Sequence, residues 1–152
     1  MTIASYCQRE VVTVSATVSV IDAARLMRDR HVGCVIATVD GAADGVPVGV
    51  LTDRDIVVAV LALNLDPEEV SVGDVMSPGP HTVGIGDARS EALEIMRAKG
   101  VRRLPVVDTE GHLVGIVSAD DLLGLVADEV SSLARLVSRE QRREREVRRI
   151  PT

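Results

Sequence analysis

Aromatic side chains are almost absent from this sequence, which contains no phenylalanine, no tryptophan and a single tyrosine, Tyr6. The hydrophobic core must therefore be aliphatic, built mainly from valine, alanine, leucine, isoleucine and methionine. Proteins that bind single-stranded nucleic acid without sequence preference stack its bases on aromatic rings. A stacking platform of that kind is excluded here, because the chain does not supply the rings.

A positive net charge, a disulfide framework and long apolar runs are also lacking. The net charge is −6, which argues against non-specific binding of nucleic acid by the chain as a whole. Two cysteines, Cys7 and Cys34, make no disulfide framework, and we expect them to be small core residues. No signal peptide is recognisable at the start, and no apolar run reaches the roughly 18 residues of a membrane span. We therefore expect a cytoplasmic protein without membrane contact.

Recognisable catalytic motifs are missing as well. No set of nucleophile, base and orienting group is apparent, and no glycine-rich loop ends in lysine. His31, His81 and His112 are scattered, and their spacing is not that of metal ligands. We therefore predict that the chain is not an enzyme and that it holds neither a metal nor a catalytic cofactor.

The sequence does contain an internal repeat. A shift of 69 residues places residues 12–14 on 81–83 and residues 23–28 on 92–97. The shift then falls to 66, and the motif at residues 49–55 matches residues 115–121. The three residues of difference lie within 40–45, a stretch of turn-forming residues.

Each half reads as strand, helix, strand, strand and helix, from helical spacing of apolar residues and from runs of β-branched residues. The predicted strands are 11–14, 34–39, 46–51, 81–83, 102–107 and 113–117, and the predicted helices are 19–30, 53–63, 87–99 and 119–130. One half of about 60 residues is marginal alone, so we expect the halves to share a core and to leave clefts between them. The predicted organisation is repeat 1 at 1–63, a linker with a short helix at 64–79, repeat 2 at 80–130 and a charged helical tail at 131–152.

A short motif, Gly-x-x-Thr/Ser-x-x-Asp, closes both halves. It places Thr52 three residues before Asp55, and Ser118 three residues before Asp121. This spacing is that of a helix capping box, in which the hydroxyl and the carboxylate satisfy free backbone N–H groups. A carboxylate also suits a ribose, because it accepts two hydrogen bonds from neighbouring hydroxyls. The two roles are compatible, since a helix N-terminus itself favours anions.

These motifs, together with the run 101–108 (VRRLPVVD) and the segment 74–77 (DVMS), resemble the CBS domain pair, also called a Bateman module. The resemblance covers about residues 3 to 128. It implies an α/β (α+β) fold of two β-α-β-β-α repeats packed sheet to sheet with pseudo-two-fold symmetry. It also implies clefts that bind AMP, ADP or ATP, and less often NAD or S-adenosylmethionine. Such modules usually pair head to head into a flat disc, so we expect a homodimer.

The resemblance implies roles for particular residues. Asp55 and Asp121 would hold ribose hydroxyls, with Thr52 and Ser118 beside them. Phosphate would be reached by the pair Arg102 and Arg103, of which we favour Arg103 because successive strand residues face opposite ways. Residues of the other repeat's first strand would flank the adenine, and these are Thr13, Val14, His81 and Thr82. The first repeat has Gly33 and Cys34 where the second has its arginine pair, and Arg54 supplies a cation where the second repeat has Asp120.

The segment after Ser131 is rich in charge, with six arginines and three glutamates between residues 138 and 149. Its simplest interpretation is a solvated extension of the last helix. The alternative is an arm that contacts a partner protein or nucleic acid. Two functional hypotheses therefore remain: a ligand-sensing regulatory module that signals to an unknown partner protein, and an interaction adaptor that acts through the arginine-rich tail.

Overall fold

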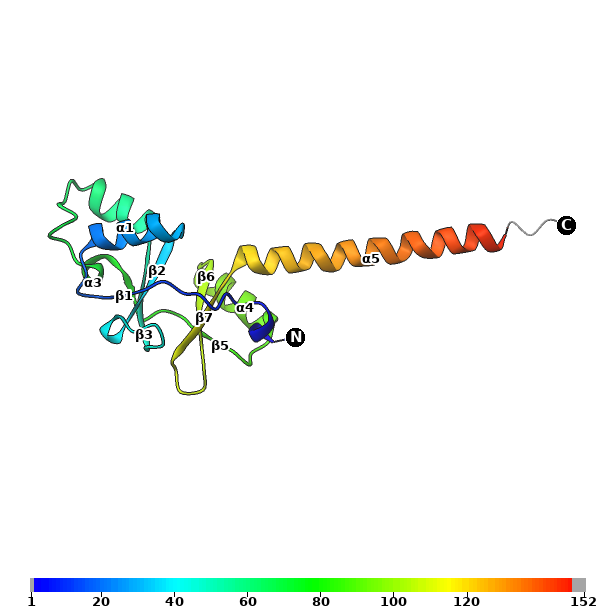
Figure 1. Cartoon of the computed structure of the whole chain (residues 1–152), viewed down its shortest axis with the longest axis horizontal. Coiled ribbons are helices and arrows are strands. Elements are labelled where there is room, and N and C mark those ends of the chain that lie inside the picture. The colour runs from blue at the N-terminus through cyan, green and yellow to red at the C-terminus, as the bar shows by residue number, and fades with distance from the viewer. Residues whose placement is uncertain (1, 149–152) are drawn as a thin grey trace.

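The computed structural model describes residues 2–148, and the last residues of the predicted tail, 149–152, lie outside them. The chain folds into two small mixed sheets flanked by helices (Figure 1). The first sheet has the order β1-β2-β3-β4, formed by Thr13–Ser15, Cys34–Thr38, Pro47–Thr52 and Ser77–Pro78. The second has the order β5-β6-β7, formed by Val83–Gly84, Arg103–Val107 and Leu113–Ser118. In each sheet the first pairing is parallel and the next antiparallel.

The pairing register repeats from one half to the other. Cys34 lies opposite Thr52 in the first sheet, and Arg103 lies opposite Ser118 in the second. Both antiparallel pairs also shift register at the same place, before the last residue of β2 and of β6. The two halves are therefore copies of one structural unit, as the sequence repeat predicted.

The helices follow from capping signals and apolar periodicity. α1 (Val20–Arg30) begins at Ser19, whose side chain accepts a hydrogen bond from the Asp22 backbone N–H. α4 (Arg89–Lys99) ends at Gly100, whose φ of 66° lies in the left-handed region that glycine adopts freely. The second helix of the first half is α2 (Asp53–Ile56), continued by a π-helical turn over Val57–Leu61. The linker contains the short helix α3 (Val72–Val75), and the chain ends in α5 (Ala119–Val147).

The buried apolar side chains form two clusters, one in each half, where a single shared core was expected. The first cluster consists of Val14, Val20, Ala23, Met27, Val35, Ala37, Leu51, Ile56, Val60 and Val72. The second consists of Ile3, Val83, Ala92, Met96, Leu104, Val106, Val117 and Leu122. Ile3 shows that the first residues of the chain pack on the second half, where the backbone N–H of Ile3 also donates to the Asp87 carbonyl at 2.9 Å.

In each half, the third strand of the repeat pairs with a chain segment that precedes that repeat or follows its last helix: Gln8 pairs with β7, and β4 pairs with β3. Gln8 exchanges two backbone hydrogen bonds with Ile116 of β7, each 2.9 Å long, and β4 pairs in the same way with Val50 of β3. Gly115 faces this approach, because a side chain there would come within 2.8 Å of the Gln8 carbonyl oxygen. Gly115, the glycine of the second motif, is therefore needed for the close approach of a second backbone segment.

Candidate functional site

Within residues 2–148, three helices begin with a capping box formed by a hydroxyl and a carboxylate, and two of these boxes are the repeated motif. The Thr52 backbone N–H donates to Asp55 Oδ2 at 2.9 Å, and the Asp55 backbone N–H donates to Thr52 Oγ1 at 3.2 Å. Ser118 and Asp121 form the same pair of bonds at 2.9 and 3.1 Å. The third box, Ser71 and Asp74, begins α3 in the linker. The predicted capping role is therefore present at both motifs.

The first cleft, of about 490 Å³, lies at the first motif. Its walls come from the end of β3 and start of α2, from residues 77–81 that follow α3, and from residues 99–105 of the second half. It brings together six of the predicted residues from the two halves: Thr52, Arg54, Asp55, His81, Arg102 and Arg103. Lys99, the only lysine of the chain, adds a cation that the sequence analysis did not single out.

The second cleft, of about 310 Å³, lies at the second motif. Ser118 and Asp121 face residues 31–34 of the first half across it, and Arg103 lines this cleft too. Its other charged lining residues are acidic, Glu10 and Asp120. The walls of the two clefts are equivalent through the repeat. The shift of 69 residues places residues 8–12 of the second cleft on 77–81 of the first, and residues 31–34 on 100–103.

Both volumes fall within the range of about 300–1,000 Å³ in which small-molecule sites lie. The two clefts nevertheless differ in charge. Arg54 lines the first cleft and Asp120 occupies the equivalent place in the second, as the sequence predicted. Arg102, whose guanidinium forms an ion pair with Asp120 at 3.0 Å, lines only the first cleft of the two. The first cleft is consequently rich in cations, whereas the second balances one arginine against three carboxylates.

Of the four residues expected from the first strands, His81 lines the first cleft, whereas Thr13, Val14 and Thr82 line neither cleft. Val14 is 6% exposed and belongs to the first core, and the Thr13 hydroxyl donates to the Gly41 carbonyl. Thr13 lines a wider hollow of about 930 Å³ that contains none of the four motif hydroxyls and carboxylates. The second cleft is lined instead by Val11 and Val12, and Thr82 lines neither cleft. The reason is that β1 begins only at Thr13, so that Val11 and Val12 lie in the segment that crosses between the halves and line the second cleft.

Two features of the second cleft carried no local sequence signal. The side-chain amide of Gln8 donates to Asp121 Oδ1 at 3.2 Å, so the carboxylate is engaged on both oxygens. Asp55 accepts only at Oδ2 among the hydrogen bonds formed within the described residues. Cys34 also lines this cleft, and burial raises the pKa of its thiol, while the nearby Arg103 lowers it and Asp53 raises it.

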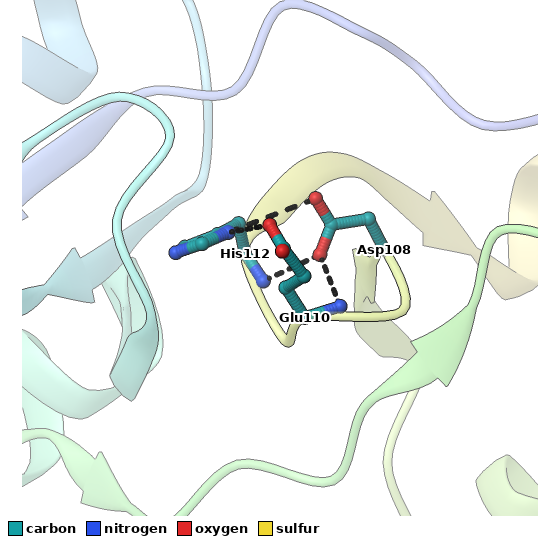
Figure 2. Close-up of side chains that lie close together, drawn as sticks. All are labelled: Asp108, Glu110 and His112. Atoms are coloured by element: carbon teal, nitrogen blue, oxygen red, sulfur yellow. Dashed lines mark hydrogen bonds and ion pairs between the residues drawn. The ribbon is translucent and has the colours of Figure 1, made fainter.

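One cluster of metal-ligand types lies away from both clefts, at the hairpin between β6 and β7 (Figure 2). Nδ1 of His112 lies 3.8 Å from Asp108 Oδ2 and 3.5 Å from Glu110 Oε2. Asp108 Oδ1 accepts the backbone N–H groups of Glu110 and His112, each at 2.9 Å, which lowers the pKa of Asp108. The tight turn accounts for this arrangement, because an aspartate that caps its own hairpin draws the following side chains together.

Within residues 2–148 no helix is both long and apolar enough to cross a membrane. The longest helix, α5, fails this requirement because its second half is densely charged.

Comparison with known proteins agrees with the internal repeat. The CBS domain model matches residues 3–62 and again residues 72–128. An uncharacterized protein of Methanopyrus kandleri is 35% identical over 123 residues, which are 81% of this chain and 61% of that protein. Hypoxic response protein 1 of Mycobacterium tuberculosis is 37% identical over 100 residues, 66% of this chain and 67% of that one.

Solved structures show the same architecture. A CBS domain protein of Pyrobaculum aerophilum, solved in complex with AMP, superposes with a TM-score of 0.73 at 29% identity, covering 80% of this chain and 90% of that one. Hypoxic Response Protein I, solved with two coordinated zinc ions, gives a TM-score of 0.71 at 32% identity, covering 81% and 97%. With two matched copies and one shared fold, the chain belongs to the CBS domain family and carries a tandem CBS pair.

Proposed function

We propose that this chain is a regulatory module that binds an adenine nucleotide, AMP, ADP or ATP, between its two CBS repeats and signals to a partner protein. The observation that carries the proposal is the pair of corresponding clefts, each built from a motif carboxylate of one repeat and a loop of the other. The AMP complex of the Pyrobaculum aerophilum relative supports an adenine nucleotide as the ligand.

The capping boxes leave room for ligand contact. Only Oδ2 of Asp55 serves the helix N-terminus, so Oδ1 remains to accept a ribose hydroxyl. Asp121 has the same cap, but its Oδ1 already accepts the Gln8 amide at 3.2 Å. A ligand in the second cleft must therefore compete with this hydrogen bond, which is charge-assisted because its acceptor is a carboxylate and which contributes about 1.5–3 kcal/mol. Nothing has to be displaced at Asp55.

Charge distinguishes the two clefts further. Phosphate is held best by charge-assisted hydrogen bonds, and arginine presents them in a planar fork. The first cleft offers Arg54, Arg102 and Arg103 together with Lys99, whereas the second offers Arg103 against Glu10 and Asp120. The lining residues favour the first cleft for the phosphorylated end and the second for a ligand with fewer phosphates.

Signalling follows from the position of the ligand between the repeats. Each repeat has its own core, so the repeats can change their relative packing without unfolding. A ligand shifts such an equilibrium only by its differential affinity for the two arrangements. The module is therefore proposed to act without catalysis. It is proposed to form a homodimer, because its helices leave large apolar side chains exposed.

Native mass spectrometry of protein purified without added ligand tests the function directly. The expected spectrum contains a species heavier than the chain, or twice the chain, by the mass of one adenine nucleotide per occupied cleft. Added AMP, ADP and ATP should populate the same species in proportion to affinity, while guanine nucleotides should not. A protein that stays free of adenine nucleotide at millimolar AMP, ADP and ATP would refute the proposal.

A further inference from the structure

Helix α5 leaves the body of the molecule after one last contact. Leu122 is buried in the second core, and Glu129 pairs with Arg89 of α4 at 2.8 Å. Every residue from 130 to 148 is exposed, and Figure 1 shows the helix projecting away from both sheets. At about 1.5 Å per residue, the 29 residues of α5 extend over roughly 40 Å.

An apolar stripe runs along this projecting helix. Leu123, Val126, Val130, Leu133 and Val137 follow one another at alternating steps of three and four residues. Steps of this kind define the a and d positions of a coiled coil, which lie on one face of each helix. The five side chains are between 41% and 66% exposed, and no other described segment covers them. Most of the stability of helices in proteins comes from the packing of an apolar face, so the stripe calls for a partner helix.

The charges along α5 indicate what that partner is. Residues 119–130 carry four acidic groups and no basic group, Asp120, Asp121, Asp128 and Glu129. Residues 131–148 carry six arginines against three glutamates. Two copies aligned antiparallel place the acidic half of each helix beside the basic half of the other, and their macrodipoles also oppose favourably. In a parallel pair Glu140 and Glu144, which continue the a and d positions, would face their own copies.

We propose that the apolar stripe of α5 pairs antiparallel with α5 of a second copy of this chain, with Val130 against Leu133 and Val126 against Val137 of the other copy. This assigns the surface of the homodimer proposed above and rests on that part of the function only. Nucleotide binding can fail without affecting it. Different helices from another protein would lack the self-complementary order of acidic and basic halves, so a second copy fits the surface best.

Disulfide cross-linking tests both the pairing and its direction. In a background of Cys7→Ala and Cys34→Ala, the double variant Val126→Cys plus Val137→Cys should form a covalent dimer under mild oxidation. Each single variant should form little, because an antiparallel pair places residue 126 beside residue 137 and not beside its own copy. Bonding within one helix is excluded, since positions eleven residues apart lie about 16 Å from each other.

The oligomeric mass of the protein without cross-links, measured in solution, supplies the control. Val130→Glu should raise the dimer dissociation constant at least about a hundredfold, because the paired stripe would bury an unpaired carboxylate. Ser132→Glu, on the exposed side of the same helix turn, should leave the dimer unchanged. Cross-linking by a single variant would overturn the antiparallel direction. A dimer that the double variant fails to trap would overturn the pairing and leave the homodimer standing, and a monomeric wild type would overturn both.

Discussion

Arg103 and Arg54 show how single side chains make the two clefts unequal. Arg103 lines both clefts, whereas Arg54 lines only the first and is replaced by Asp120 in the second. A charged residue at this position therefore adds attraction for phosphate on one side of the molecule and repulsion on the other. Affinity for phosphate should depend on Arg54 more than affinity for the nucleoside does.

We predict that Arg54→Ala weakens ATP binding by roughly tenfold or more, the loss expected for a charge-assisted hydrogen bond. Adenosine binding should change little, because the nucleoside has no group for this guanidinium to contact. Titration calorimetry with both ligands measures the difference. Arg25→Ala is the matched control, since Arg25 pairs with Asp22 on α1 and lines neither cleft. Equal losses for ATP and adenosine would show that Arg54 acts on the fold and not on phosphate.

Cys34 offers a probe of the second cleft that needs no mutation. Burial raises the pKa of its thiol, so at neutral pH a smaller fraction is thiolate than in an unperturbed cysteine. Alkylation of Cys34 should therefore be slow near neutral pH. Its rate should rise at a higher pH than the rate of alkylation of an unperturbed cysteine. A ligand in the second cleft should slow it further, because Cys34 lines that cleft.

Peptide mass spectrometry after timed iodoacetamide treatment follows this reaction at Cys34 separately from Cys7. The protein without ligand and the protein with excess nucleotide are compared across the pH range. Rapid modification of Cys34 at neutral pH would contradict the effect of burial on its pKa. Equal rates with and without nucleotide, at saturation confirmed by calorimetry, would show that the second cleft is empty.

Helices and strands were the most predictable level of this structure. The repeat placed all six strands of the two predicted units, because the apolar runs and the two offsets constrain each other. The first strands were less certain: β1 begins at Thr13 and β5 at Val83, two residues later than predicted in each half. Local strand propensity does not give the reason. The residues shortly before each of these strands pair with a strand of the other half, Gln8 with β7 and β4 with β3, so the first strand starts later.

The last helix was within reach of sequence reasoning. α5 runs from Ala119 to Val147, in agreement with the predicted helix at 119–130 and its extension as a charged helical tail. No glycine or proline lies between Gly124 and residue 148, and the segment is rich in strong helix formers, so propensity favours continuation. The residues that meet across the clefts, such as Gln8 and Asp121, belong to different halves, and no periodic pattern reports contacts of that kind.

The motif glycines give a prediction about the crossing segments. An added side chain at Gly115 would meet the Gln8 backbone oxygen at 2.8 Å, which cannot move without breaking the Gln8–Ile116 pairing. At Gly49 it would meet only the flexible side chain of Met76. Gly115→Ala should therefore destabilise the fold by about 1–3 kcal/mol, and Gly49→Ala by less. Urea unfolding of both variants measures this order, and the reverse order would contradict the close backbone approach.

The molecule as a whole combines a repeated scaffold with two unequal sites. The equivalent registers of β2-β3 and β6-β7 produce clefts of the same construction, and the side chains within them have diverged. The two repeats have separate apolar cores, and the proposed change in packing between the repeats depends on this separation. The sequence predicted the existence of two clefts and their charge difference. It did not predict which cleft is better suited to phosphate, because Lys99 and Arg102 enter the first cleft from the second repeat.

The central claim, nucleotide binding by a motif carboxylate in the cleft between repeats, is tested most directly by AMP titration calorimetry of three variants. Asp55→Ala removes the carboxylate of the first cleft, Asp121→Ala that of the second, and Asp74→Ala the same capping group in the linker, outside both clefts. Melting temperatures without ligand are recorded in parallel, since all three variants lose a cap and should lose similar stability.

The account predicts that Asp55→Ala weakens AMP binding roughly ten- to a hundredfold, the equivalent of about 1.5–3 kcal/mol for a charge-assisted bond to ribose. Asp121→Ala should reduce AMP affinity less, or affect only a second and weaker binding event. Asp74→Ala should bind AMP as the wild type does. If all three variants bind AMP with wild-type affinity, or if the wild type binds no AMP, the two motifs are capping boxes alone and the proposed site is wrong.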